Sequence, residues 1–169
     1  MRPYKHFIAF LPYSLFLIGC GELSEKNTTE SNDDIEATIT ITETPVFHQS
    51  HEAKKENAPF SDVVQVGNTY YLAGQIGMDH TVRELVSGGI VPETKQALEN
   101  IKAVLSHHRL SMADVVKATV ILDNIEDFQA FNEIYVEHFP QKPARTTFAA
   151  EALAANAAIE IEVVAVRKE

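Results

Sequence analysis

The chain has 169 residues, of which 45% are hydrophobic and 22% are charged, so it can bury one ordinary core and leaves little room for a second. Its formal net charge of -10 does not provide the concentrated positive field that phosphate binding needs, and we therefore expect no nucleic-acid partner. Cys20 is the single cysteine, which excludes a disulfide within the chain.

Residues 1–19 have the pattern of a bacterial signal peptide. A short basic start precedes an apolar run over residues 7–19, which is too short to cross a bilayer as a helix. The run ends at residues 17–20 in Leu-Ile-Gly-Cys, which resembles a lipobox: an apolar pair, a small residue at the scissile bond, and the cysteine that receives lipid. We therefore predict that Cys20 becomes the acylated first residue of an exported lipoprotein.

This N-terminal pattern predicts anchoring to membrane lipid at the bacterial cell envelope. Several acyl chains on Cys20 would hold the protein firmly, because each buried methylene contributes about 0.8 kcal/mol. Gly21 is not the aspartate that usually retains a lipoprotein in the inner membrane, which favours the periplasmic face of the outer membrane if the cell is Gram-negative. The alternatives are a soluble periplasmic protein with an ordinary secretory signal, or a buried apolar helix with a free thiol.

Residues 20–50 have the composition of a disordered acidic tether. They are rich in Glu, Asp, Ser, Thr and Asn, and Lys26 is their only basic residue apart from a histidine, so they cannot bury enough surface to offset the cost of ordering. Residues 35–41 alternate as a strand does, but no partner is evident and they stay in the tether. The folded domain is predicted to occupy residues 51–169.

The folded part begins with a predicted hairpin and a predicted helix. Residues 63–66 and 69–74 are apolar and flank Gly67-Asn68, a two-residue turn that tolerates positive φ. Pro92 suits a first helical turn, and apolar residues then recur at helical spacing up to His108. We assign Glu93 and Glu99 to the solvated face of this helix.

A strand, a second helix and two further strands follow. Residues 115–122 are apolar and β-branched, and after a break at Asp123-Asn124 aromatic residues recur at three- and four-residue steps from 128 to 139. This helical spacing assigns Phe128, Phe131 and Tyr135 to the core. Prolines end that helix, and residues 145–150 read as a strand. In residues 158–166 the alternation is strict: Ile159, Ile161, Val163 and Ala165 point one way, and Glu160, Glu162, Val164 and Val166 the other.

This order of elements predicts an α+β fold in which two helices cover one face of a sheet. The opposite face would carry Val and Ile without a covering layer, and such an apolar face is an aggregation hazard in a monomer. We therefore expect the chain to form oligomers through its bare sheet face.

Six segments resemble the Rid (YjgF/RidA) family, and the resemblance covers the chain from about residue 57 to the C-terminus. Each segment alone is a weak signal, but six in the family's order make chance similarity untenable. The segments are Gly67-Asn68, Ala73 to Asp79, Leu85 to Ile90, Gln96 to Leu105, Pro143 to Arg145, and Ile159 to Glu162.

The resemblance implies a chorismate-mutase-like fold and a homotrimer, with the sheets packed as a central barrel and three equivalent clefts between neighbouring subunits. In the deaminating members, an arginine matching Arg145 binds the substrate carboxylate, and an acidic residue matching Glu160 handles the water. The implied reaction is hydrolysis of reactive imines and enamines, such as 2-iminopropanoate, 2-iminobutanoate and 2-aminoacrylate, to 2-keto acids and ammonia.

The chemistry of the two candidate catalytic residues fits this reaction. The planar fork of Arg145 can hold a carboxylate through two hydrogen bonds, and the carboxyl group of Glu160 can serve as acid and base in turn. An imine is already activated toward water, so we expect neither a cofactor nor a metal. The alternative for both residues is a solvated or salt-bridged position on a polar sheet face.

Six further residues are candidates for substrate binding. Backbone groups at Ala73, Gly74 and Gln75 could orient the substrate, and Asn132 is either a polar position on the second helix or a border of the cleft. Phe60 stands where deaminating members usually carry tyrosine, and Thr147 where many carry cysteine. These two departures leave open a non-catalytic trimer that binds small carboxylates or serves as an interaction module.

Overall fold

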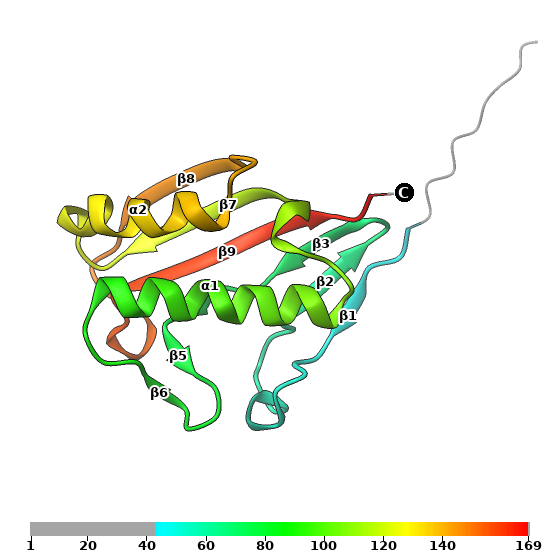
Figure 1. Cartoon of the computed structure of the whole chain (residues 1–169). Helices are drawn as coiled ribbons and strands as arrows, with labels where there is room; N and C mark the ends of the chain where they lie inside the picture. Colours follow the sequence, from blue (N-terminus) through cyan, green and yellow to red (C-terminus); the bar gives the residue numbers. More distant parts are fainter. Residues whose placement is uncertain (1–42, 169) are drawn as a thin grey trace, which may run out of the picture. The chain divides into compact units, whose positions relative to one another are not determined.

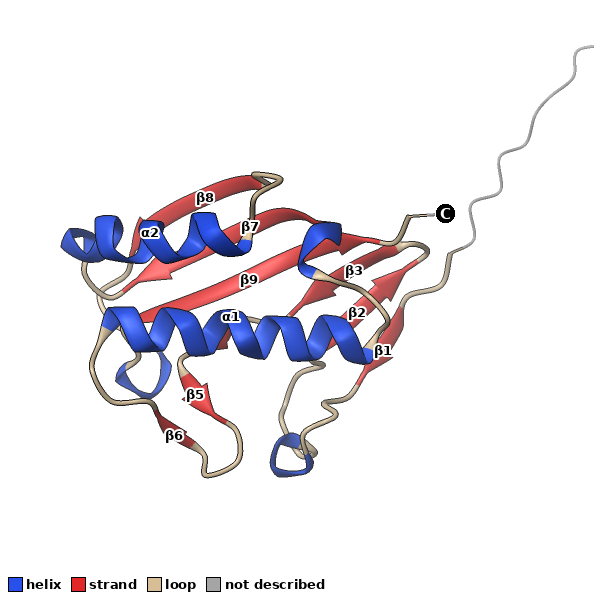
Figure 2. Cartoon of the chain, viewed as in Figure 1, coloured by secondary structure: helices blue, strands red, loops and turns tan. Residues whose placement is uncertain are grey.

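Two α-helices lie on one face of a mixed sheet (Figure 1 and Figure 2). The computed structural model describes residues 43–168. The helices are α1 (Ile90–His107) and α2 (Phe128–His138). The seven-stranded sheet contains β1 (Val46–His48), β2 (Val63–Val66), β3 (Thr69–Leu72), β4 (Gln75–Ile76), β7 (Val115–Leu122), β8 (Ala144–Ala149) and β9 (Ile159–Val166).

The sheet runs in the order β1-β2-β3-β9-β7-β8, and β4 pairs with the N-terminal part of β9. The β7–β8 pair is parallel and the other pairs are antiparallel. A separate small hairpin joins β5 (Met78–Asp79) to β6 (Glu84–Leu85). Within residues 43–168, no helix combines the length and the apolar character that crossing a membrane requires.

The predicted helices and strands are confirmed, with shifts at their ends. Helix α1 begins at Ile90, two residues before Pro92, because Gly89 adopts φ 75° and turns the chain into the helix. The second strand of the predicted hairpin ends at Leu72 rather than Gly74, since the chain there leaves β3 and resumes pairing with β9 as β4.

Strand β1 corrects the predicted boundary of the tether. Val46–His48 lie inside residues 20–50, yet they pair antiparallel with β2, with Phe47 opposite Val64. A short segment of this kind becomes a strand because the edge of β2 supplies its hydrogen-bonding partner, which the local sequence does not reveal. The predicted signal peptide, Cys20 and the strand-like residues 35–41 lie outside the described residues.

The core lies between the helices and the inner face of the sheet. Ile159, Ile161, Val163 and Ala165 of β9 are all buried, which confirms the alternation predicted for that strand. They pack in one cluster with apolar residues of both helices, including Leu98, Ile101, Leu105, Phe131 and Tyr135. Phe128, which we predicted as core, is 36% exposed at the start of α2.

Glu93 contradicts its assignment to the solvated face of the first helix. Its side chain is buried, and Oε2 accepts a hydrogen bond from the backbone N of Ala158 at 2.8 Å. A Cβ at Gly77 would approach the Cα of Glu93 to 2.5 Å, so glycine permits the close contact between this turn of α1 and the β4–β5 connection. Glu99 is exposed as predicted and lies 3.3 Å from Lys102 Nζ.

Within residues 43–168, no helix covers the outer face of the sheet, as the order of elements predicts (Figure 2). Phe47 is 67% exposed, Tyr71 49% and Phe148 45%, and all three point away from the helices by their register. Large exposed aromatic side chains on one sheet face are typical of a surface that packs against another subunit.

Candidate active site

The two predicted catalytic side chains point to opposite faces of the sheet. Arg145 of β8 lies opposite Ala118 of β7, which is fully buried beneath the helices. Glu160 of β9 lies opposite Ile121, three residues further along β7. Because paired residues share a face and successive residues alternate, an offset of three places Arg145 on the helix side and Glu160 on the bare side.

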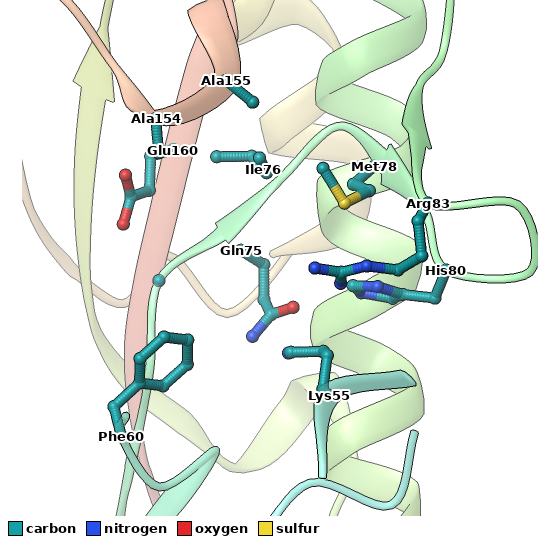
Figure 3. Close-up of a pocket in the computed structure, with 11 residues that line it drawn as sticks. Lys55, Phe60, Gln75, Ile76, Met78, His80, Arg83, Ala154, Ala155 and Glu160 are labelled. Carbon is teal, nitrogen blue, oxygen red and sulfur yellow. The ribbon is translucent and has the colours of Figure 1, made fainter. Parts of the chain in front are cut away.

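Glu160 lines a cavity of about 340 Å³ where β4 pairs with β9. Figure 3 shows its carboxylate at one side of the cavity, with the ring of Phe60 and the side chain of Gln75 along the same cavity. Gly74 also lines this space, and a Cβ at that position would collide with the Glu160 carboxylate. Glycine at position 74 therefore makes room for the acid, and we call this space the Glu160 cleft.

Burial raises the pKa of Glu160, and the negative charge of Glu162 on the same face of β9 raises it further. A carboxyl group whose pKa moves toward neutrality holds a proton more readily and can also accept one, which suits general acid–base chemistry. The environment of Glu160 thus fits the role that the family resemblance implies.

Ala73 does not line the Glu160 cleft. Its backbone N donates to Asp62 O at 2.9 Å, and its carbonyl accepts a hydrogen bond from Gln75 Nε2 at 3.2 Å. Gln75 is 2% exposed, so its side chain braces the backbone at this bend while its position lines the cavity. Of the three predicted rim residues, Gly74 and Gln75 reach the cavity, and Ala73 supports them.

Arg145 lines a second, separate cavity of about 270 Å³ between α2 and the start of β8. Its Nη1 donates to Asn132 Oδ1 at 2.9 Å, and its guanidinium lies 4.5 Å from the ring centroid of Tyr135. Phe131 and Phe128 flank the same guanidinium at 5.2 and 5.6 Å. The aromatic side chains of α2 and Asn132 therefore fix the orientation of the arginine.

The surroundings of Arg145 include two buried hydroxyl groups. Thr147 lies two residues after Arg145, on the same face of β8. Neither its Oγ1 nor the hydroxyl of Tyr135 has a hydrogen-bond partner within residues 43–168. Buried polar groups normally find partners, so these two hydroxyls are available to a bound polar group or to a neighbouring subunit. We call the group formed by Arg145, Asn132, Tyr135 and Thr147 the arginine cluster.

Sequence reasoning missed several residues of these two cavities. Tyr135 was predicted only as core, although aromatic residues at helical spacing can also enclose a cation. Lys55, His80 and Arg83 line the Glu160 cleft, and they were not selected in the sequence analysis. The signal in the sequence was that His80 and Arg83 lie three residues apart in one short loop, between β5 and β6. Within the described part of the chain, no three metal-ligating side chains converge on a possible ion site.

Comparisons with known proteins agree with this architecture. The family described as Endoribonuclease L-PSP matches residues 50–167. The human 2-iminobutanoate/2-iminopropanoate deaminase is 44% identical over 110 residues, which are 64% of this chain and 80% of that protein. A RutC family protein of Pyrococcus horikoshii is 40% identical over 120 residues, which are 70% of this chain and 95% of that protein.

A solved structure extends the similarity to three dimensions. The crystal structure of RidA from an Antarctic Psychrobacter species superposes with a TM-score of 0.67 at 34% identity, covering 72% of this chain and 99% of that chain. The family match begins just after β1 and runs past the end of β9. The chain therefore belongs to the Rid/L-PSP family and has the family's chorismate-mutase-like α+β fold.

Proposed function

We propose that the protein hydrolyses reactive imines and enamines of small amino-acid-derived acids to 2-keto acids and ammonia, in clefts shared by adjacent subunits of a homotrimer. The substrates are of the 2-iminopropanoate, 2-iminobutanoate and 2-aminoacrylate type. One observation carries the proposal: Glu160 and Arg145 line separate cavities on opposite faces of one sheet, each with its own supporting residues. Relatives named as deaminases support the same chemistry.

A trimer would bring the two half-sites together. Within residues 43–168, β8 is the edge strand of the sheet, so Arg145 lies where a neighbouring subunit can approach. The bare face that carries Glu160 also carries exposed Phe148 and Tyr71, which need cover. Packing the bare face of one subunit against the edge of the next is a head-to-tail contact, and it closes into a trimer when neighbouring subunits are related by a third of a turn.

In this proposal, Arg145 binds the substrate carboxylate and Glu160 moves protons. The guanidinium grips both carboxylate oxygens, which holds the adjacent imine carbon in place. Glu160 takes a proton from the attacking water as the water oxygen bonds to the carbon of the protonated imine, which gives a carbinolamine. Glu160 passes this proton to the nitrogen, and as the C–N bond breaks the carbinolamine hydroxyl gives its proton to Glu160 and becomes the keto oxygen. One water enters, ammonia leaves, and the keto acid remains, so the reaction needs no cofactor.

The two departures from the family's pattern fit this scheme. Phe60 is 50% exposed in the Glu160 cleft, where its ring can pack against a substrate side chain without offering a hydroxyl. Thr147 keeps a polar group beside Arg145. The family's name refers to an endoribonuclease, but the net charge of -10 and the paired acids Glu160 and Glu162 oppose RNA as a substrate.

An assay that traps imines tests the proposed reaction. D-Amino-acid oxidase converts D-alanine to 2-iminopropanoate, and semicarbazide captures the imine at a measurable rate. We expect purified full-length protein to slow this capture, because hydrolysis removes the imine first. The full chain is required, since deleting residues 1–50 would remove strand β1.

The same assay distinguishes the alternative of a non-catalytic carboxylate-binding module. Capture at an unchanged rate would reject the enzyme. If calorimetry then showed that small carboxylates such as propionate bind to the protein, the carboxylate-binding module would be supported. If the protein neither hydrolysed the imine nor bound small carboxylates, the interaction module would be the remaining function.

We also propose that Cys20 anchors the exported protein to the cell envelope through lipid. The support is the pattern of residues 1–20. In bacterial cells fed an alkyne analogue of palmitate, we expect the wild type to be labelled and to sediment with membranes, whereas Cys20→Ala loses both properties. Equal labelling of the two proteins would contradict the anchor, and an unlabelled wild type in the periplasm would indicate a soluble exported form.

A further inference from the structure

The Glu160 cleft has a basic end as well as an acidic one. Figure 3 shows the side chains of Arg83 and His80 lying side by side and pointing toward Gln75, on the side of the cavity away from Glu160. Lys55 lies below them along the same wall. An adjoining cavity of about 300 Å³ shares Lys55, Phe60 and Arg83. Basic side chains therefore gather in one part of a chain whose formal net charge is -10.

The nearby carboxylates do not neutralise Arg83. Asp62 Oδ1 lies 2.9 Å from Lys55 Nζ, and both side chains are buried. Asp79 accepts hydrogen bonds from Thr81 N at 2.8 Å and from Thr81 Oγ1 at 2.6 Å, which shape the turn between β5 and β6. Within residues 43–168, no carboxylate forms a salt bridge with Arg83, so its guanidinium is free to bind an anion.

Two further features of the basic end are those of a ligand-binding site. His80 Nδ1 is buried without a hydrogen-bond partner in the described part of the chain, although buried polar atoms normally have one. Arg83 holds φ at 68° while its N donates to Asp79 O at 2.8 Å, a left-handed conformation that is unfavourable for residues other than glycine. The turn thus holds a long basic side chain over the cavity in a position where glycine would fit without strain.

We propose that Arg83 and His80 form a second anion subsite, which selects imines with a carboxylate on their side chain, such as the four-carbon imine of aspartate. This inference rests on the proposed function and names its substrate class. Arg145 of a neighbouring subunit would hold the carboxylate next to the imine carbon. Arg83 would grip the distal carboxylate with its planar fork, and His80 would donate from Nδ1 in the tautomer that carries its proton there.

The test compares two imines that differ only in the distal carboxylate. D-Aspartate oxidase yields 2-iminosuccinate and D-amino-acid oxidase yields 2-iminopropanoate, and each is assayed by trapping with full-length protein. We expect Arg83→Gln to lower the ratio of kcat/KM for 2-iminosuccinate to that for 2-iminopropanoate by about 10- to 100-fold, as expected when one charged partner of a carboxylate is lost. Arg83→Lys keeps the positive charge but lacks the planar fork, so its kcat/KM ratio should lie between those of the wild type and Arg83→Gln.

Calorimetry with succinate and propionate separates this inference from the proposed reaction. We expect Arg83→Gln to weaken succinate binding by about 10-fold or more relative to propionate binding. If neither imine is hydrolysed but this difference in binding remains, the proposed reaction fails and the subsite stands. A substrate ratio and a binding ratio that are both unchanged in Arg83→Gln would overturn the subsite, even if both imines are hydrolysed rapidly.

Discussion

Replacing Arg145 with alanine is expected to abolish imine hydrolysis, with kcat/KM for 2-iminopropanoate falling by about 10³-fold, because two charge-assisted hydrogen bonds to the substrate carboxylate are lost together. The fold should persist, since Arg145 is only partly buried and its hydrogen bond to Asn132 is replaceable by water. Arg145→Lys is the matched control: it retains the charge and loses the fork, so its activity should be intermediate. Size-exclusion chromatography should give the wild-type oligomer for both variants.

Mixing inactive variants tests whether the site is shared between subunits. Subunits carrying Arg145→Ala keep Glu160, and subunits carrying Glu160→Gln keep Arg145. When equal amounts are denatured and refolded together, random assembly should restore about a quarter of the wild-type activity, because one site in four then receives an intact residue from each neighbour. Each variant refolded alone should stay inactive. No recovery in mixed oligomers, or full turnover by Arg145→Ala itself, would rule out the shared cleft.

Replacing Glu160 with glutamine is expected to lower kcat by about 10²- to 10⁴-fold, because the amide can neither accept a proton from water nor deliver one to the leaving nitrogen. The same change should stabilise the fold at neutral pH. Burial raises the pKa of Glu160 in the folded state, so the stability that this group contributes is present at acid pH and is lost as the pH rises through the folded pKa.

The gain in stability should therefore depend on pH. Urea unfolding at pH 7 should show a higher free energy of unfolding for Glu160→Gln than for the wild type, and the difference should vanish below the ordinary glutamate pKa of about 4.3, where both states of the wild type are protonated. A variant less stable than the wild type at pH 7 would show that the carboxylate forms stabilising contacts, and would contradict its role as an acid held at a raised pKa.

Glu162→Gln is the matched control for Glu160→Gln. Glu162 lies on the same strand and face but is exposed, and its charge contributes to the raised pKa of Glu160. We expect this variant to keep its turnover while the acid limb of its pH–rate profile moves to lower pH, because Glu160 then loses its proton more easily. An unmoved acid limb would show that another group governs this part of the profile.

Local sequence patterns predicted most helices and strands. They failed where contact with a segment distant in the sequence determines whether a residue is buried or paired. The strict alternation of β9 and the helical spacing of α1 are properties of a few consecutive residues, so they could be read directly. Glu93 looked like a surface residue because glutamate is seldom buried without a partner, but the turn at Gly77 and the N–H of Ala158 enclose it. The partner of β1 is likewise a strand fifteen or more residues away.

The same contrast applies to the histidines. Individually, His48, His51, His107 and His108 lack the spacing of a site, yet the fold brings their rings together, with the centroids of His48 and His108 4.6 Å apart. Burial lowers the pKa of His108, and the charges of the neighbouring histidines lower it further. No spacing rule could have predicted this cluster, because it joins the N-terminal strand to the end of α1.

The sequence by itself determined both helices, the longer strands and the layer order of this protein, because apolar periodicity records which side of each segment faces the core. Its resemblance to the Rid family also pointed to Arg145 and Glu160 as the reacting pair. The tertiary structure alone decided that these two side chains lie on opposite faces of one sheet. The reason is that facing depends on the register between β7, β8 and β9, which long-range pairing sets and no local pattern encodes.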